Sequence, residues 1–366
     1  MLKIFIWGTG WRAQQVLTQY NLSGQYDIIG FVDNNRNKWG MDFLGKKIHE
    51  PAVLQKIQFD KVFILVDKYE GIACQIREML GEELTDRIEN YKYFYKQQLI
   101  ARYEESDDPE IQEVLRYVRE KDLQIFNYDF ADTYKNLQIE TVFDTDCGMY
   151  YVCHGDKRLY FAKSLDTSEK VIEYYRQLLI EQDEQSPHRY VTESFCVGEG
   201  DVVIDAGAAE GIFALESIDK VSRIYLVEAD PKWIEALEKT FMDYRDKVVI
   251  IPQYLTSMNS GILSTLDSLI EEPVNFIKMD IEGNEWDALL GAEKLICKSE
   301  DLKCAICSYH TDFDEILIRD TLGKYGMECS VSRGYMWFHL CRKTSYVSTK
   351  FCHGIVRASK SSSFLG

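Results

Sequence analysis

Two acidic residues and one histidine lie at the predicted ends of three β-strands. Asp205, Asp280 and His310 each close a short apolar run or follow it directly. In open α/β sheets the carboxyl ends of the strands face the crevice where ligands bind. Carboxylates and an imidazole at that edge can bind a cation, orient a hydroxyl group or move a proton. The sequence therefore predicts a functional site at this edge of the sheet.

The turn after the first of these strands is the most specific pattern. Residues 202–211 read VVIDAGAAEG, a buried strand that ends in an acid and is followed by small residues that open a helix. Gly207 and Gly211 would let the backbone approach a ligand closely, and Glu210 adds a carboxylate within the turn. Acids beside the glycines favour a cationic ligand over a pyrophosphate. S-adenosyl-L-methionine (SAM) carries a sulfonium and an ammonium group and fits this pattern.

Glu228 ends the next expected strand, about 20 residues after the first glycine of that turn, where an acid can bind a ribose diol. Further on, Asp280 is followed by Glu282 and Glu285 in a turn that contains glycine. This carboxylate cluster has three interpretations: a divalent cation site, a group that orients a substrate hydroxyl, or helix capping. His310 follows the neighbouring strand and is a candidate base, the alternative being a loop histidine without a role.

The N-terminus carries a weaker nucleotide-binding pattern. Residues 8–13 read GTGWRA, a G-x-G-x-x-A motif after a strand, and Asp33 closes the next strand. Gly8, Gly10 and Asp33 therefore form a tentative nucleotide site. Its ligand stays open between a nucleotide-sugar, NAD and none.

The elements around these motifs predict an α/β protein with two Rossmann-like parallel-sheet domains. We expect a nucleotide-binding-type domain over residues 1–95, a helical connector with a β-hairpin over 96–185, a second α/β domain over 186–358 and a tail over 359–366. We expect strands over residues 3–7, 26–32, 61–66, 202–205, 224–228, 248–251, 274–280, 302–308, 328–340 and 349–358, and a helix over 231–244.

Composition excludes several classes of function. The chain has 366 residues, 46% of them hydrophobic, and a formal net charge of −18. The acidic excess lies between residues 101 and 300 and would repel phosphate backbones and anionic lipids, so we expect neither nucleic-acid nor membrane-surface binding. No apolar run approaches the ~18 residues of a membrane span. Ten cysteines in a chain of this length favour a reducing cytoplasm over a disulfide framework.

Cys304 and Cys307, with His310 nearby, have a metal-like spacing. Positions three apart on a strand point to opposite faces, so we interpret both cysteines as buried apolar residues. No metal is assigned from the sequence, although a divalent cation at the carboxylate cluster stays open.

Residues 182–357 resemble the FkbM-type family of SAM-dependent methyltransferases. The resemblance rests on five segments, residues 186–190 (SPHRY), 205–211, 227–231 (VEADP), 265–269 (TLDSL) and 276–285, and on Tyr309-His310. It implies a class I methyltransferase fold and O-methylation of a hydroxyl on a small-molecule or glycan acceptor, such as a sugar or a natural product.

Carried over by the same resemblance, the SAM site would be lined by Asp205, Gly207, Ala208, Gly211 and Glu228, whereas Asp280 and His310 would lie near the acceptor. Ala209 departs from the pattern, because glycine or asparagine is more usual there.

The N-terminal domain resembles Rossmann-like domains found beside sugar-modifying enzymes of bacterial polysaccharides. Two alternatives therefore stay open. One is an oxidoreductase that uses NAD or a nucleotide-sugar through the N-terminal domain, and the other is a non-catalytic binding module in glycan assembly.

Overall fold

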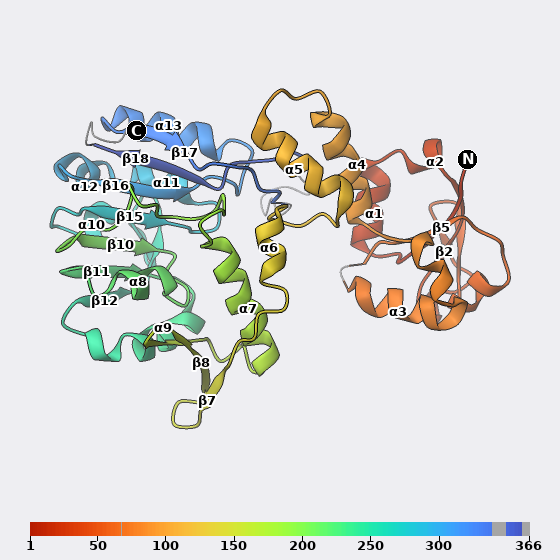
Figure 1. The fold of residues 1–366 in the computed structure, drawn as a ribbon, viewed down its shortest axis with the longest axis horizontal. Helices are drawn as coiled ribbons and strands as arrows, with labels where there is room; N and C mark the ends of the chain where they lie inside the picture. Colours follow the sequence, from red (N-terminus) through yellow and green to blue (C-terminus); the bar gives the residue numbers. More distant parts are fainter. Residues whose placement is uncertain (67, 339–348, 361–366) are drawn as a thin grey trace. The chain divides into compact units, whose positions relative to one another are not determined.

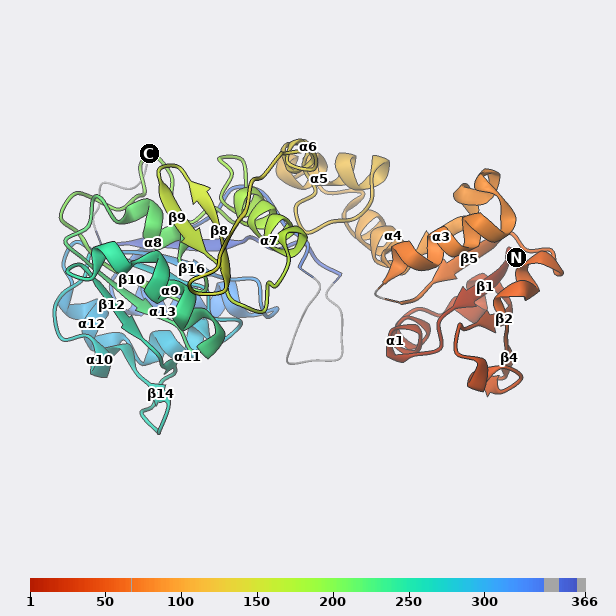
Figure 2. The same ribbon diagram turned by 90° about the horizontal axis from the view of Figure 1, so that it is seen from below.

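The computed structural model describes residues 1–66, 68–338 and 349–360 and divides into two compact units. Unit 1 comprises Met1–Ser106 and Val118–Leu123, and unit 2 comprises Asp107–Tyr117 and Gln124–Gly366. Figures 1 and 2 show an α/β arrangement in each. This division differs from our expected connector over 96–185, most of which is part of unit 2.

Unit 1 is built on a six-stranded sheet of order β3-β4-β2-β1-β5-β6. Its strands are β1 (Lys3–Trp7), β2 (Asp27–Val32), β3 (Asp42–Phe43), β4 (Lys46–His49), β5 (Lys61–Ile64) and β6 (Ile88–Asn90). All pairs are parallel except β3 with β4. The parallel strands thus follow the order 3-2-1-4-5, which is the order of a doubly wound Rossmann-like sheet without its sixth strand. Its helices are α1 (Trp11–Gln19), α2 (Leu22–Gln25), α3 (Tyr69–Leu80) and α4 (Lys92–Tyr103).

Unit 2 contains a seven-stranded sheet of order β12-β11-β10-β15-β16-β18-β17. The strands are β10 (Val202–Ala206), β11 (Arg223–Val227), β12 (Val248–Ile251), β15 (Phe276–Met279), β16 (Lys303–Cys307), β17 (Glu328–Val331) and β18 (Ile355–Ser359). The first five are parallel, and β18 runs antiparallel to both β16 and β17. This order is that of the class I methyltransferase fold.

Helices and small sheets complete unit 2. The helices are α5 (Pro109–Glu120), which continues into unit 1, α6 (Asp129–Thr133), α7 (Ser168–Glu181), α8 (Ile212–Ser217), α9 (Pro231–Thr240), α10 (Leu266–Leu269), α11 (Glu285–Leu290), α12 (Glu293–Lys298) and α13 (Asp314–Lys324). A three-stranded antiparallel sheet consists of β7 (Val142–Asp144), β8 (Met149–His154) and β9 (Lys157–Tyr160), and β13 (Tyr254–Leu255) pairs with β14 (Leu263–Ser264).

The central strands are apolar on both faces because both faces are covered. One core cluster packs β8, β9 and α7 with α8 and α9, and it includes Phe213 and Cys307. A second cluster lies on the other face and includes Ile277, Cys304 and Ile306. The two cysteines thus belong to different clusters, as their spacing predicted.

A row of side-by-side residues crosses the sheet of unit 2. Asp205 on β10 pairs in register with Lys278 on β15, which pairs with Ala305 on β16, which pairs with Arg357 on β18. Cross-strand partners point to the same face of a sheet. The charged side chains of Asp205, Lys278 and Arg357 therefore lie on one face.

Some predicted elements differ from the structure. The strand expected over 328–340 ends at Val331, and residues 339 and 340 lie outside the described residues. Within 349–358 only β18 is a strand, and it begins at Ile355. The helix expected over 231–244 is α-helical to Thr240. Residues 361–366 of the expected tail also lie outside the described residues.

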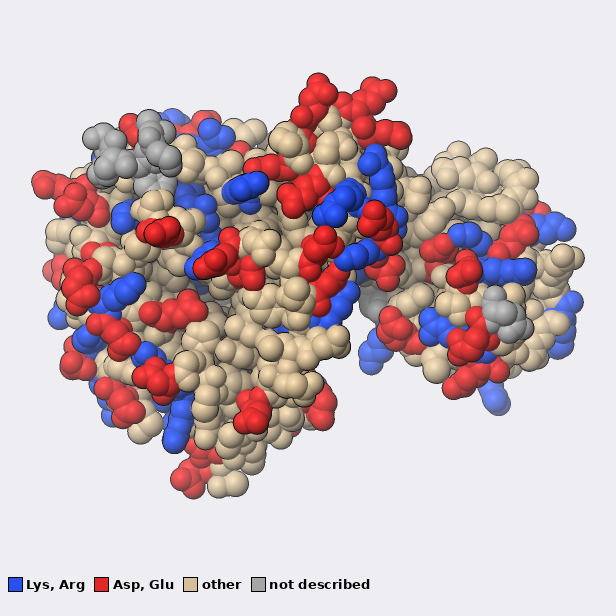
Figure 3. All heavy atoms as spheres, viewed as in Figure 1, with Lys and Arg blue, Asp and Glu red and all other residues tan. Residues whose placement is uncertain are grey.

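Acidic and basic side chains are mixed on the surface. Figure 3 shows acidic side chains spread over the visible face with lysines and arginines between them. Among the described residues, no helix is both long and apolar enough to cross a membrane.

Candidate active site

A cavity of about 260 Å³ opens at the carboxyl ends of β10, β15 and β16. Five of the residues around it are acidic: Glu181, Asp205, Glu210, Asp280 and Glu282. The other lining residues include Tyr174, Tyr190, Gly207, Ala208, Ala209, Lys278, Tyr309, His310 and Phe338. The cavity is therefore rich in carboxylates.

Asp205 and Lys278 form a buried ion pair across the sheet. Their carboxylate oxygen and Nζ lie 2.9 Å apart, and their side chains are 1% and 5% exposed. Burial alone would lower the pKa of Lys278, but Asp205 and Asp280 together raise it above its usual value. Lys278 also donates to the carbonyl oxygen of Gly207 (2.7 Å). Asp205 thus lines the cavity, but its charge is balanced by a lysine that we did not predict as a site residue.

The turn after β10 requires glycine at two positions, because a side chain there would overlap neighbouring atoms. Gly207 has a φ of +74°, and a Cβ there would overlap the carbonyl oxygen of Asp280. Gly211 has a φ of +87°, and a Cβ would lie 2.8 Å from the ring of Phe241. Ala209 has a φ of +47°, in the left-handed region that favours glycine or asparagine. Ala209 therefore departs from the family pattern in residue type, but its backbone adopts the conformation that glycine or asparagine favours.

Glu228 anchors this turn. Its Oε2 accepts from the backbone N–H of Ala209 (2.8 Å), and its Oε1 accepts from the N–H of Asp230 (2.7 Å). It does not line the cavity described above. Its contact with a ribose diol stays a prediction.

Glu210 faces the cavity, as expected of a residue that binds a cation. The hydroxyl of Tyr174 donates to its Oε2 (3.0 Å). Burial raises the pKa of Glu210 to about 7. Glu181, at the end of α7, is near Asp280 and Glu210, and burial together with those charges raises its pKa to about 8.

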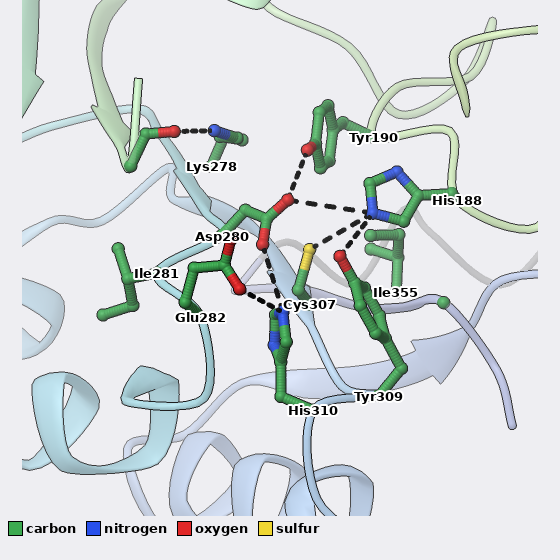
Figure 4. A network of polar contacts seen from close by, with 12 residues as sticks. His188, Tyr190, Lys278, Asp280, Ile281, Glu282, Cys307, Tyr309, His310 and Ile355 are labelled. Carbon is green, nitrogen blue, oxygen red and sulfur yellow. Dashed lines mark hydrogen bonds and ion pairs between the residues drawn. The ribbon is translucent and has the colours of Figure 1, made fainter. Parts of the chain in front are cut away.

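Asp280 is the centre of a polar network (Figure 4). Its Oδ2 accepts from the hydroxyl of Tyr190 (2.9 Å) and lies 3.8 Å from Nε2 of His188, while its Oδ1 lies 3.7 Å from Nε2 of His310. Burial opposes ionisation of Asp280, but the two histidines and Lys278 outweigh it, so its pKa is lowered. Asp280 is therefore an ionised carboxylate at neutral pH.

His310 lies among three carboxylates. Its Nδ1 is 3.2 Å from Glu285, and its Nε2 faces Asp280 and Glu282. Burial lowers the pKa of His310, but Glu285 and the other two acids outweigh this effect and raise it to about 9. The imidazole is therefore mostly protonated at neutral pH, and its role as a base stays a prediction.

His188 behaves in the opposite way. Burial lowers its pKa to about 4, so it is neutral at physiological pH. Its Nε2 lies 3.0 Å from the hydroxyl of Tyr309 and 3.8 Å from Sγ of Cys307. We had noted residues 186–190 only as part of the resemblance. Residues 186–190 and Tyr309, which precedes His310, are the sequence features from which this part of the network could have been found.

Two groups in this network have ligand atoms close enough for one metal ion. They are His188, Asp280 and Cys307, and Asp280, Glu285 and His310. Glu285 also accepts from the backbone N–H groups of Ile281 (2.8 Å) and Gly283 (3.2 Å), so it closes the turn before α11. The N-cap of α11, Asn284, has no side-chain cap hydrogen bond, so these contacts are not the helix cap that one interpretation expected. The divalent cation stays a prediction.

In unit 1 the tentative nucleotide residues are arranged around an ion pair. Asp33 accepts from Thr9 and from Nζ of Lys38 (2.8 Å), and these contacts outweigh burial and lower its pKa. Gly8 has a φ of +108°, and Gly10 precedes the first turn of α1. The carboxylate expected to bind a ribose is thus engaged by Lys38, and the nucleotide site stays a prediction.

Two family models match the chain in sequence. Residues 262–323 match the methyltransferase FkbM domain, and residues 1–93 match the C2185-like, N-terminal family. No curated protein matches the chain as a whole or in part.

Solved methyltransferases share parts of the fold at low identity. Methyltransferase FkbM from Methylobacillus flagellatus KT is 16% identical, with 98% of this chain and 90% of that chain covered, at a TM-score of 0.42. The precorrin-6y C5,15-methyltransferase from Geobacter metallireducens GS-15 is 14% identical, with 46% and 83% covered, at 0.34. Magnesium protoporphyrin IX methyltransferase from Synechocystis PCC 6803, solved with bound SAM, is 15% identical, with 44% and 71% covered, at 0.31.

The family match begins just before β14 and ends within the last turn of α13, and this part of unit 2 supplies Asp280, Glu285 and His310. Residues 262–323 therefore match an FkbM-type methyltransferase domain, within a unit that has the class I strand order. The protein is a SAM-dependent methyltransferase.

Proposed function

We propose that the protein transfers the methyl group to a hydroxyl of a sugar, a glycan or a related natural product. The observation that carries the proposal is the pairing of the ionised Asp280 with His310 at the ends of two adjacent strands, inside a cavity lined by carboxylates. A hydroxyl needs a hydrogen-bond acceptor that orients it and a group that takes its proton. Asp280 and His310 offer both.

The residues that line the cavity also fit the charge of the cofactor. SAM is cationic at its sulfonium and ammonium groups, and five acidic residues surround a cavity whose own cations are Lys278 and the protonated His310. We propose that Asp205, Gly207, Ala208, Glu210 and Gly211 hold it, with Glu228 supporting the turn through Ala209. The bound cofactor supplies an electrophilic methyl group. The protein contributes mainly by aligning the acceptor oxygen with that methyl group.

In this proposal Nε2 of His310 accepts the proton of the acceptor hydroxyl. Glu285 is 1% exposed and lies 3.2 Å from Nδ1, so it favours the tautomer that carries a proton on Nδ1 and leaves Nε2 free to accept. With a pKa of about 9, only about 3% of His310 is neutral at pH 7.5. Catalysis by this base should therefore become faster as the pH rises toward 9.

A labelling experiment tests the proposal. The full chain is incubated with SAM labelled with carbon-13 in its methyl group and with pools of monosaccharides, glycosides and hydroxylated natural products. We expect a product whose labelled carbon has the chemical shift of a methoxy group. His310→Asn should retain SAM binding and lose most of the turnover. Labelled methyl on nitrogen or carbon only, or unchanged turnover in His310→Asn, would contradict the proposal.

A further inference from the structure

A second cavity of unit 2 has no place in the chemistry described above. It has a volume of about 380 Å³ and lies among α5, the start of α6, residues 184–192, residues 333–334 and β18. Ligand pockets of proteins begin at about this size. None of its lining residues also lines the cavity beside Asp280. Four arginines line it: Arg116, Arg189, Arg333 and Arg357.

Two of these arginines are neutralised by acids. Arg116 pairs with Asp129 (3.0 Å), and Arg333 pairs with Glu110 (3.4 Å). Both arginine side chains are exposed, at 56% and 87%. These pairs are ordinary surface contacts and give the cavity no net positive charge.

Arg357 differs because it is buried and has no acidic partner in the part of the chain that the structure describes. It lies on β18 and is 9% exposed. Its Nε and Nη2 donate to the backbone carbonyls of Tyr190 (3.4 Å) and Arg189 (2.5 Å), and Nη1 donates to no described residue. It forms no ion pair within the described parts of the chain. Burial and the positive charge of Arg189 lower the pKa of Arg357 to about 10.

Arg189 adds a second charge beside the first. Its Nε donates to the carbonyl of Val191 (2.8 Å), and among residues 1–66, 68–338 and 349–360 it has no ion-pair partner. Glu113 and Glu184 also line the cavity, but both are exposed and neither is paired with these arginines. Two neighbouring guanidinium groups, one of them buried, are therefore uncompensated in a chain with a net charge of −18.

Buried charges in proteins are normally paired, and a buried cation without a carboxylate is expected where an anionic ligand supplies the partner. Guanidinium groups bind phosphate and carboxylate oxygens through paired N–H donors. We propose that this cavity is a binding site for an oxyanion, the phosphate or carboxylate group of a small polar molecule, with Arg357 and Arg189 as its donors. The proposal does not depend on the identity of the methyl acceptor.

Calorimetric titration of the full chain tests this site, with inorganic phosphate and malonate as probes and chloride at equal ionic strength as reference. We expect saturable binding of at least one probe, and the tighter one assigns a phosphoryl or a carboxylate ligand. Arg189→Gln should weaken that binding at least tenfold. The matched control is Arg116→Gln, which changes a paired, exposed arginine of the same cavity and should alter the affinity less than twofold.

Arg357→Lys keeps the charge but removes the paired donors, and it should weaken binding at least fivefold. If this variant does not fold, Arg189→Gln decides. The proposal is overturned if neither probe binds more strongly than chloride, or if Arg189→Gln binds as the wild type does. Equal losses in Arg116→Gln and Arg189→Gln would also overturn it, because the anion would then lie on exposed arginines.

Discussion

Among the carboxylates around His310, Glu285 has the largest influence on its charge state, and this dependence can be measured. Glu285→Gln removes the negative charge 3.2 Å from Nδ1 of His310. The amide oxygen of glutamine can still accept from the N–H groups of Ile281 and Gly283, so the turn before α11 is retained. The variant therefore changes the electrostatics with little change in the fold.

The size of the effect follows from the surroundings of the ring. Contacts with Glu285 are the largest of the influences that raise the pKa of His310 to about 9, and burial lowers it. An opposite charge at this separation shifts a pKa by about one to three units, so we expect the pKa of His310 to fall to between about 6 and 8. At pH 8 the protonated fraction should then drop from about nine-tenths to half or less.

Proton NMR of the imidazole Cε1–H signals across pH 5 to 10 measures this shift directly, and His310→Asn assigns the signal. The control is Glu282→Gln, since Glu282 lies 3.8 Å from Nε2 and its side chain is 55% exposed. Solvent weakens that pair, so we expect a change of a few tenths of a unit. If Glu285→Gln leaves the pKa of His310 within about 0.3 units of the wild type, or if the control shifts it as much, our electrostatic account is refuted.

Three further variants test the turn after β10, and the pH profile of the wild type tests the proton transfer. Gly207→Ala should abolish SAM binding and lower the melting temperature, because its Cβ would overlap the carbonyl of Asp280; wild-type affinity would contradict this. Ala209→Gly should stabilise the fold by about 0.5–1 kcal/mol in urea unfolding, since it relieves a positive φ, and a loss of stability would argue against that reasoning. Glu228→Gln should weaken SAM binding about tenfold in calorimetry through the loss of a charged acceptor, and an unchanged affinity would exclude that role. The kcat/KM of the wild type should rise with pH up to about 9, and a maximum near pH 7 would exclude His310 as the base.

The central strands around the site were predictable because their signals are local. Each central strand of unit 2 is a short apolar run, and Asp205, Asp280 and His310 end or follow such runs. Since parallel strands end at one edge of the sheet, the sequence alone indicated that these residues face one crevice. The family match over residues 262–323 agrees with the resemblance proposed from the motifs.

The partners of these residues could not be predicted, because they depend on register between distant segments. Lys278 faces Asp205 only because β10 and β15 pair in that register. His188 and Tyr190 reach Asp280 from about ninety residues earlier in the chain, and no local pattern encodes that contact. The pKa of His310 likewise depends on burial beside Glu285, which spacing alone does not reveal.

Calorimetric titration with S-adenosylhomocysteine, the demethylated cofactor, tests our central claim most directly. We predict that it binds the full chain in a one-to-one ratio and that Glu210→Gln, which changes a carboxylate of the cavity beside Asp280, weakens the binding about tenfold. NADH and a UDP-sugar serve as competing probes for unit 1. If S-adenosylhomocysteine does not bind, or if Glu210→Gln binds it as tightly as the wild type, the cavity beside Asp280 is not the cofactor site.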